Sequence, residues 1–158
     1  MMYFPLFADI SQKDILIVGG GPVAARRAHT LLAFDARITV ITPEATQELR
    51  GEEANGRLSL ILRAFEEDDL DGRDLVLAAT DETALNARIA GSCREKGIPV
   101  NVSSDPSLCD FQFPSVVMDE DVVIGINASG KDHGRVKEMR QKLEDVLATP
   151  SLYDETKE

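Results

Sequence analysis

The sequence lacks tryptophan, holds only two cysteines and two histidines, and is 5% aromatic. No apolar run approaches the roughly 18–20 residues that a membrane-spanning helix needs. Cys93 and Cys109 stand sixteen positions apart, a spacing that fits no metal or redox motif, so we expect two reduced, mostly buried thiols and no metal site. These absences argue against disulfide-bonded, metal-cluster and membrane-spanning proteins.

Basic residues are also scarce, because 17 Lys and Arg stand against 28 Asp and Glu, which gives a net charge of −11. Such a surface disfavours nucleic acid, although a local basic patch still permits a small anionic ligand. The first residues lack the basic and long apolar regions of a secretory signal. We therefore expect a cytoplasmic protein with no nucleic acid and no membrane as partner.

What the sequence does contain is a regular alternation of two kinds of segment. Short apolar or β-branched runs predict strands at residues 15–18, 37–42, 58–62, 75–80 and 99–102. The helices expected between them cover residues 22–34, 43–49 and 81–96. Strands and helices in this order predict an α/β fold, a Rossmann-like doubly wound parallel sheet.

The rhythm changes after Asn101. Residues 114–118 and 122–127 are strand-like runs with too few residues between them for a helix, which predicts an antiparallel β-hairpin. A turn and a charged C-terminal helix at 135–147 follow. The expected domains are a Rossmann domain at 1–113, a hairpin plus helix at 114–148 and a polar tail at 149–158.

A glycine turn, Gly19-x-Gly21-x-x-Ala24, follows the first predicted strand and opens the first helix. There Gly19 permits the tight turn, Gly21 lets backbone N–H groups approach a pyrophosphate, and Ala24 lets helix and strand pack closely. The diphosphate then lies on the positive end of the helix. The alternative is a glycine-rich turn that binds nothing. We expect a dinucleotide, contacted by the turn glycines Gly19, Gly20 and Gly21.

The end of the second strand bears on the choice of cofactor. An acidic residue for the adenosine ribose is expected about 20 positions downstream of the glycine turn. The sequence has Thr42, Pro43 and Glu44 there, and no arginine to hold a 2′-phosphate, so NAD is favoured over NADP. Thr80 and Asp81, at the end of the fourth strand, are further cofactor contacts, or only caps of the next helix.

Five segments stand in a fixed order along the chain: Phe4-Pro5-Leu6-Phe7, residues 15–24, Ala79-Thr80-Asp81, Pro99-Val100-Asn101-Val102 and Cys109-Asp110-Phe111-x-Phe113-Pro114. Over about residues 3–147 the sequence resembles the precorrin-2 dehydrogenase family, the NAD-dependent N-terminal module of siroheme synthase. The resemblance implies oxidation of precorrin-2 to sirohydrochlorin with NAD, followed in some members by ferrochelation. It also implies that the cofactor contacts Gly21-Pro22-Val23 and Pro43-Glu44. The members commonly form homodimers, paired here through residues 114–127. Longer members add a helical domain, so we expect a short form.

The resemblance also supplies candidate catalytic residues. The family's acid/base aspartate lies in a motif like Asn-Val-Val-Asp, whereas this chain reads Asn101-Val102-Ser103-Ser104-Asp105. Ser104 therefore holds the family's position, and Asp105 follows it. A serine hydroxyl has no carboxylate chemistry at neutral pH. For Asp105, hydrogen bonding within the Asp105-Pro106 turn is the alternative role.

Precorrin-2 carries eight carboxylates, so its site requires cations and hydrogen-bond donors. The candidate substrate-binding residues are Asn101, Ser129, Lys131, His133 and Arg135, with further cations at Lys137, Arg140, Arg26 and Arg27. For each cation the alternative is an ordinary solvated helix charge, and for His133 a surface imidazole. Three functions stay open: an NAD-dependent dehydrogenase, a non-catalytic dinucleotide- or tetrapyrrole-binding protein, and a sirohydrochlorin ferrochelatase.

Overall fold

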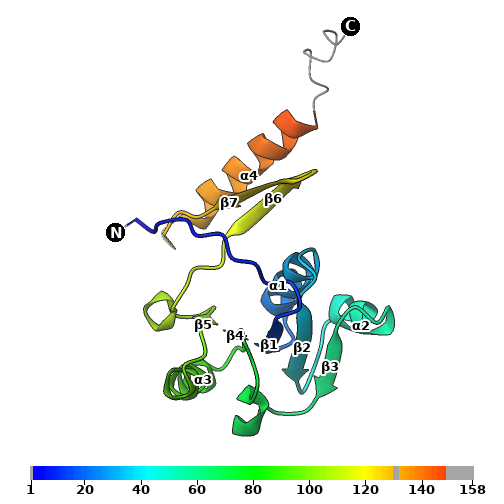
Figure 1. Ribbon diagram of the computed structural model, residues 1–158, viewed down its shortest axis with the longest axis vertical. Helices are drawn as coiled ribbons and strands as arrows, with labels where there is room; N and C mark the ends of the chain where they lie inside the picture. Colours follow the sequence, from blue (N-terminus) through cyan, green and yellow to red (C-terminus); the bar gives the residue numbers. More distant parts are fainter. Residues whose placement is uncertain (1, 130–131, 149–158) are drawn as a thin grey trace, which may run out of the picture. The chain divides into compact units, whose positions relative to one another are not determined.

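The computed structural model describes residues 2–129 and 132–148, with the backbone alone at His133. The predicted tail at 149–158 lies outside the described residues. The chain divides into two compact units, each described by itself. The sheet unit is Phe7–Gln112, and the hairpin unit combines Met1–Leu6 with Phe113–Glu158 (Figure 1).

The sheet unit is built on five parallel strands. They are β1 (Asp14–Val18), β2 (Arg37–Thr42), β3 (Ser59–Leu62), β4 (Leu75–Ala78) and β5 (Val100–Val102), in the order β3-β2-β1-β4-β5. The chain runs outward from β1 to β3 and then returns to the other side of β1. This reversal opens a crevice at the carboxyl ends of β1 and β4, where such sheets bind ligands. The predicted doubly wound sheet is confirmed.

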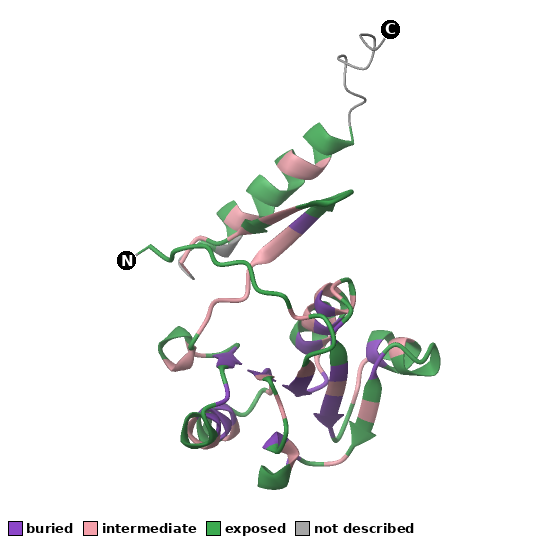
Figure 2. Ribbon diagram, in the orientation of Figure 1, coloured by how far each residue is buried: buried purple, intermediate pink, exposed green. Residues whose placement is uncertain are grey.

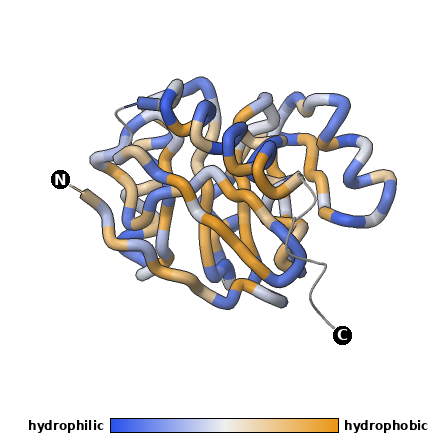
Figure 3. The backbone as a smooth tube through the Cα atoms, turned by 90° about the horizontal axis from the view of Figure 1, so that it is seen from above, coloured by the Kyte–Doolittle hydropathy of each residue, from blue (hydrophilic) through white to orange (hydrophobic). Residues whose placement is uncertain are grey.

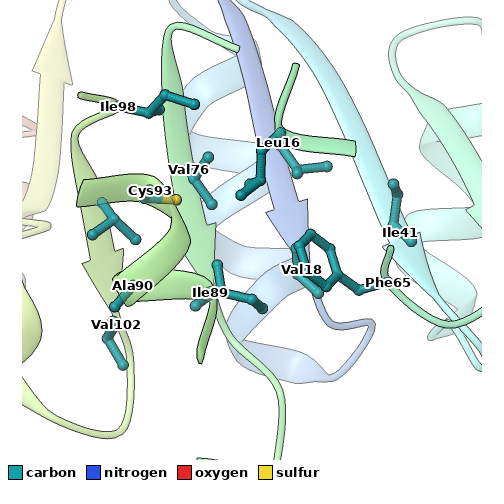
Figure 4. Close-up of a cluster of buried hydrophobic side chains, with 13 residues drawn as sticks. Leu16, Val18, Ile41, Phe65, Val76, Ile89, Ala90, Cys93, Ile98 and Val102 are labelled. Carbon is teal, nitrogen blue, oxygen red and sulfur yellow. The ribbon is translucent and has the colours of Figure 1, made fainter. Parts of the chain in front are cut away.

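Helices cover both faces of this sheet. They are α1 (Pro22–Leu32), α2 (Gln47–Ala54) and α3 (Thr83–Lys96), with the 3-10 helices η1 (Glu67–Leu70) and η2 (Pro106–Leu108). Ile89 and Cys93 of α3 share one hydrophobic cluster with Leu16 of β1 (Figure 4). Ile15 and Ile17 point to the opposite face and are equally buried, and α1 contacts β1 and β2. Figure 2 shows buried residues in the central strands and in the helices that pack on them. In Figure 3 hydrophobic stretches alternate along the chain with hydrophilic ones.

The predicted start of the second helix at Pro43 is wrong. Residues 43–46 form a turn, in which the Thr42 hydroxyl donates to the Glu44 carbonyl at 2.7 Å. The Thr46 amide donates to the Gly20 carbonyl at 3.0 Å, and the Thr46 hydroxyl caps α2 by accepting from the Leu49 amide. Contacts with the glycine turn therefore delay the helix by four residues.

The acidic segment at residues 66–71 contains η1. Asp69 accepts from the Glu66 amide at 2.8 Å and from the Arg63 guanidinium, which holds the pKa of the Asp69 carboxyl below its usual range. Leu70 is fully buried. A local ion pair and one apolar anchor thus order a segment that composition alone makes look solvated.

The hairpin unit consists of β6 (Ser115–Asp119), β7 (Val122–Ile126) and α4 (His133–Leu147). The strands pair antiparallel, and α4 contacts both of them, so the predicted hairpin and C-terminal helix are confirmed. The helix begins two residues before the prediction because Asp132 caps it by accepting from the Arg135 amide at 2.8 Å. Among the described residues of this unit, Val117 is the one buried hydrophobic side chain.

The two cysteines are free thiols, as expected. Cys93 is buried, and its burial raises the pKa of the thiol to about 11, while Cys109 is half-buried. Within residues 2–129 and 132–148, no helix is long and apolar enough to cross a membrane.

Candidate functional site

A cleft of about 980 Å³ opens at the carboxyl ends of β1, β2 and β4. Its walls are the glycine turn, the turn after β2, residues 64–65 after β3, the loop after β4, and the first turns of α3. Eight of the ten predicted cofactor contacts line the cleft, whereas Pro22 and Val23 do not. The sequence prediction lacked Phe65, Leu85 and Arg88, among others, which reach the cleft only because β3 and α3 fold beside it.

The three glycines of the turn serve different purposes. Gly19 has φ +118°, and a Cβ on it would lie 2.3 Å from the Ala79 carbonyl oxygen. A Cβ on Gly20 would lie 2.1 Å from the Glu44 carbonyl oxygen. Apart from its chain neighbours, no described residue places a heavy atom within 4 Å of a Cβ on Gly21. Packing therefore requires the first two glycines, whereas the third leaves space open at the mouth of α1.

The N-terminus of α1 is suited to a diphosphate. Gly21 is its N-cap, no side chain caps the helix, and its first turn contains no acidic residue. In the described part of the chain, neither the Gly21 amide nor the Val23 amide has a hydrogen-bond acceptor. Unpaired N–H groups at the positive end of a helix dipole attract an anion. Pro22 and Val23 are exposed here, and Ala24 is fully buried, as its predicted packing role requires.

The turn after β2 carries the predicted ribose contacts. Thr42 is buried and its hydroxyl proton is used on the Glu44 carbonyl, so it is a poor donor to a ligand. Pro43 and Glu44 are exposed, and both line the cleft. Arg50, which sequence reasoning missed, donates from Nε to the carbonyl of Ala45, another cleft residue, at 3.4 Å. A carboxylate and a guanidinium thus stand near one turn.

The loop after β4 places Thr80 and Asp81 in the cleft wall. Thr80 does not cap α3, whose N-cap is Glu82; it instead accepts from the Glu82 amide at 3.2 Å. Asn86, fully buried on α3, accepts from both the Thr80 amide and its hydroxyl, at 3.2 and 2.7 Å. The Asn86 amide group also donates to the Thr80 carbonyl and, at 3.1 Å, to the Ser104 hydroxyl.

Neither candidate catalytic residue, Ser104 or Asp105, lines the cleft, and their side chains have different hydrogen-bond partners. Ser104 is exposed and accepts from Asn86, and its own hydroxyl proton has no acceptor among the described residues. The Asp105 carboxylate accepts from the Ser107 hydroxyl at 2.7 Å and from the Ser107 amide at 2.9 Å. These bonds hold the pKa of the Asp105 carboxyl below its usual range. Asp105 is therefore a carboxylate at neutral pH and is occupied by its turn.

The Cys-Asp-Phe segment fixes the loop that carries Ser104. The Cys109 thiol accepts from the Val102 amide at 3.1 Å, and an Asp110 carboxylate oxygen accepts from the Val100 amide at 2.9 Å. The Phe111 carbonyl accepts from the side chain of Asn101 at 2.8 Å. Asn101, a predicted substrate contact, is 3% exposed, and its Oδ1 has no partner in the described chain.

The remaining substrate candidates lie mostly in the hairpin unit. Lys131 and the side chain of His133 lie outside the described residues. Ser129 has φ +57° and Arg135 is exposed on α4. Of the further cations, Arg140 pairs with Glu144 at 2.7 Å, and burial lowers the pKa of Arg27 on α1. Over the residues that the structure describes, no group of three His, Cys, Asp or Glu side chains could hold a metal ion.

Comparisons with known proteins agree with this geometry. Siroheme synthase of Psychrobacter sp. (strain PRwf-1) is 39% identical over 147 residues, which cover 93% of this chain and 30% of that protein. Siroheme synthase 2 of Yersinia pestis (strain Pestoides F) is 39% identical over 149 residues, 94% of this chain and 32% of that protein. The chain thus spans about a third of the length of these curated relatives. The sequence resemblance is confirmed.

A solved structure, that of SirC, precorrin-2 dehydrogenase, is also similar. It has a TM-score of 0.75 and 26% sequence identity, and the match covers 91% of this chain and 71% of that one. A family model described as putative NAD(P)-binding matches residues 6–115, which contain the whole cleft. The open α1 N-terminus and this match lead to one conclusion: the chain belongs to the putative NAD(P)-binding family.

Proposed function

We propose that this chain oxidises precorrin-2 to sirohydrochlorin with NAD as the hydride acceptor. The observation that carries the proposal is the α1 N-terminus, where the Gly21 and Val23 amides have no acceptor among the described residues and Gly21 leaves room for a diphosphate. The similarity to SirC, precorrin-2 dehydrogenase, and to siroheme synthases supports the choice of substrate. NAD bound in the cleft would supply the hydride acceptor for the reaction.

The residues of this chain would divide the remaining work. Gly21 and Val23 would bind the diphosphate, and Glu44 the adenosine ribose. Ser104 would orient the substrate through its free hydroxyl proton, because Asp105 is committed to Ser107. The proton that leaves precorrin-2 with the hydride would pass to solvent near this exposed loop.

Homodimer formation and a cytoplasmic location belong to the same proposal. Met118 and Val122 of the hairpin are 49% and 56% exposed, and Met139 of α4 is 42% exposed. Since a small unit with little buried apolar surface is marginally stable alone, a second copy that covers these side chains would stabilise it.

A non-catalytic binding protein is the second candidate, because a hydroxyl stands where the family has a carboxylate. The ferrochelatase alternative has no observation that favours it, and metal insertion into sirohydrochlorin would detect it.

Turnover tests the proposed reaction. With precorrin-2 and NAD supplied, the wild-type protein should produce NADH, seen as a rise of absorbance in the reduced nicotinamide band. Protein that binds NAD but gives no such rise would contradict the proposal. In that case Ser104→Asp is informative, because turnover gained from nothing would identify the natural chain as the non-catalytic form.

Substitutions in the glycine turn separate cofactor binding from folding. Gly21→Ala should weaken NAD binding at least about tenfold, since its methyl group fills the space for the diphosphate, and should cost at most about 1 kcal/mol of stability. Gly19→Ala should instead lower the free energy of unfolding by about 2 kcal/mol or more, because of its φ and the Ala79 carbonyl. NAD titration and urea unfolding of both variants measure the difference. Wild-type NAD affinity in Gly21→Ala would contradict this placement of the diphosphate.

The choice between NAD and NADP should depend on Glu44. A 2′-phosphate beside its carboxylate is repelled, so the wild type should bind NAD about tenfold more tightly than NADP. Glu44→Gln should narrow this ratio by improving NADP binding. Arg50→Gln, on α2 directly after that turn, is the control and should leave the NAD affinity unchanged. If the wild type prefers NADP and Arg50→Gln loses that preference, the Arg50 guanidinium and not Glu44 sets the choice of cofactor, and the prediction is wrong.

A further inference from the structure

The buried amide of Asn86 connects two loops that are far apart in the sequence. Its side chain is fully buried, and it uses its full hydrogen-bonding capacity: two bonds accepted from Thr80, one donated to Thr80 and one donated to Ser104. Thr80 follows β4 and lines the cleft, whereas Ser104 follows β5 and does not. The side chain of Asn86 joins the loops that carry Thr80 and Ser104.

This arrangement is unusual for the position. Asn86 stands on α3 in line with Ile89, Ala90 and Cys93, all of which belong to the hydrophobic cluster. A polar group in such a stripe carries a desolvation cost unless all of its bonds are made. The groups that Asn86 contacts are uncharged, so no ion pair compensates. An apolar residue would suffice for packing alone, and the amide instead orients two loops.

We propose that Asn86 is a positioning residue that sets the cofactor-binding loop at Thr80 and the proton-side loop at Ser104 relative to each other. The Ser104 part of this inference rests on the proposed function, and the Thr80 part rests on cofactor binding alone. Through Asn86, a change at Ser104 is transmitted to the cleft wall, although Ser104 does not line the cleft. Because Ser104 accepts this bond, its hydroxyl proton stays available for a bond to a ligand.

The central test is Asn86→Asp, which keeps the shape and removes both donated hydrogen bonds. At pH 8 the new carboxylate should repel the Thr80 carbonyl and weaken NAD binding at least about fivefold. As the pH falls and the carboxyl group takes up a proton, one donated bond returns and the affinity should recover. Ile89→Val, a core change on the same helix, is the control. Calorimetric titration with NAD at pH 8 and at a lower pH, where the carboxyl group is protonated, measures the effect, with the wild type in parallel.

An affinity in Asn86→Asp that equals the wild type, or a loss that matches Ile89→Val at both pH values, would overturn the proposal. If Asn86→Asp does not fold, Ser104→Ala decides. Its exposed side chain is dispensable for folding, yet the proposal expects NAD binding to weaken about twofold or more, and an unchanged affinity would overturn it. Absence of NADH formation by the wild type would end the proposed reaction, while the NAD titrations would still decide the role of Asn86.

Discussion

The close approach of Gly19 to the carbonyl of Ala79 is the constraint on which the cleft depends. Their backbones leave no room for a Cβ, and the Ala79 amide donates to the Val18 carbonyl at 2.8 Å, so the ends of β1 and β4 are held together. These strands are neighbours although β2 and β3 lie between them in the sequence. The contact therefore holds β1 and β4 together at the point where the strand order reverses. It also places the N-terminus of α1 at the edge of the crevice.

Hydrogen bonds of polar groups position the turn after β2 and the loops after β4 and β5. The turn after β2 lies against Gly20 through the Thr46 amide, and the loops after β4 and β5 are held by Asn86 and by the Cys-Asp-Phe segment. The cofactor side is thus held by defined hydrogen bonds, while the exposed Ser104 hydroxyl keeps a proton to donate.

The sequence was most informative where one physical signal dominated. The bounds of β2 match the prediction because its β-branched run ends at a turn, and Gly97 ends α3 in the left-handed conformation, as a glycine after a helix should. Pro43 misled because proline at a helix start and proline in a turn look alike, and the deciding bond to Gly20 is tertiary. Asn86 did leave a signal, a polar residue within an apolar helical stripe. Its partner Ser104 could not be read from spacing.

A crystal structure with NAD shows directly whether the open N-terminus of α1 holds a dinucleotide beside the loops that Asn86 links. The diphosphate should accept hydrogen bonds from the Gly21 and Val23 amides, the adenosine ribose should lie at Glu44, and Ser104 rather than Asp105 should face the nicotinamide end. NAD bound away from α1, or Asp105 released from Ser107 and directed at the nicotinamide, would contradict the account.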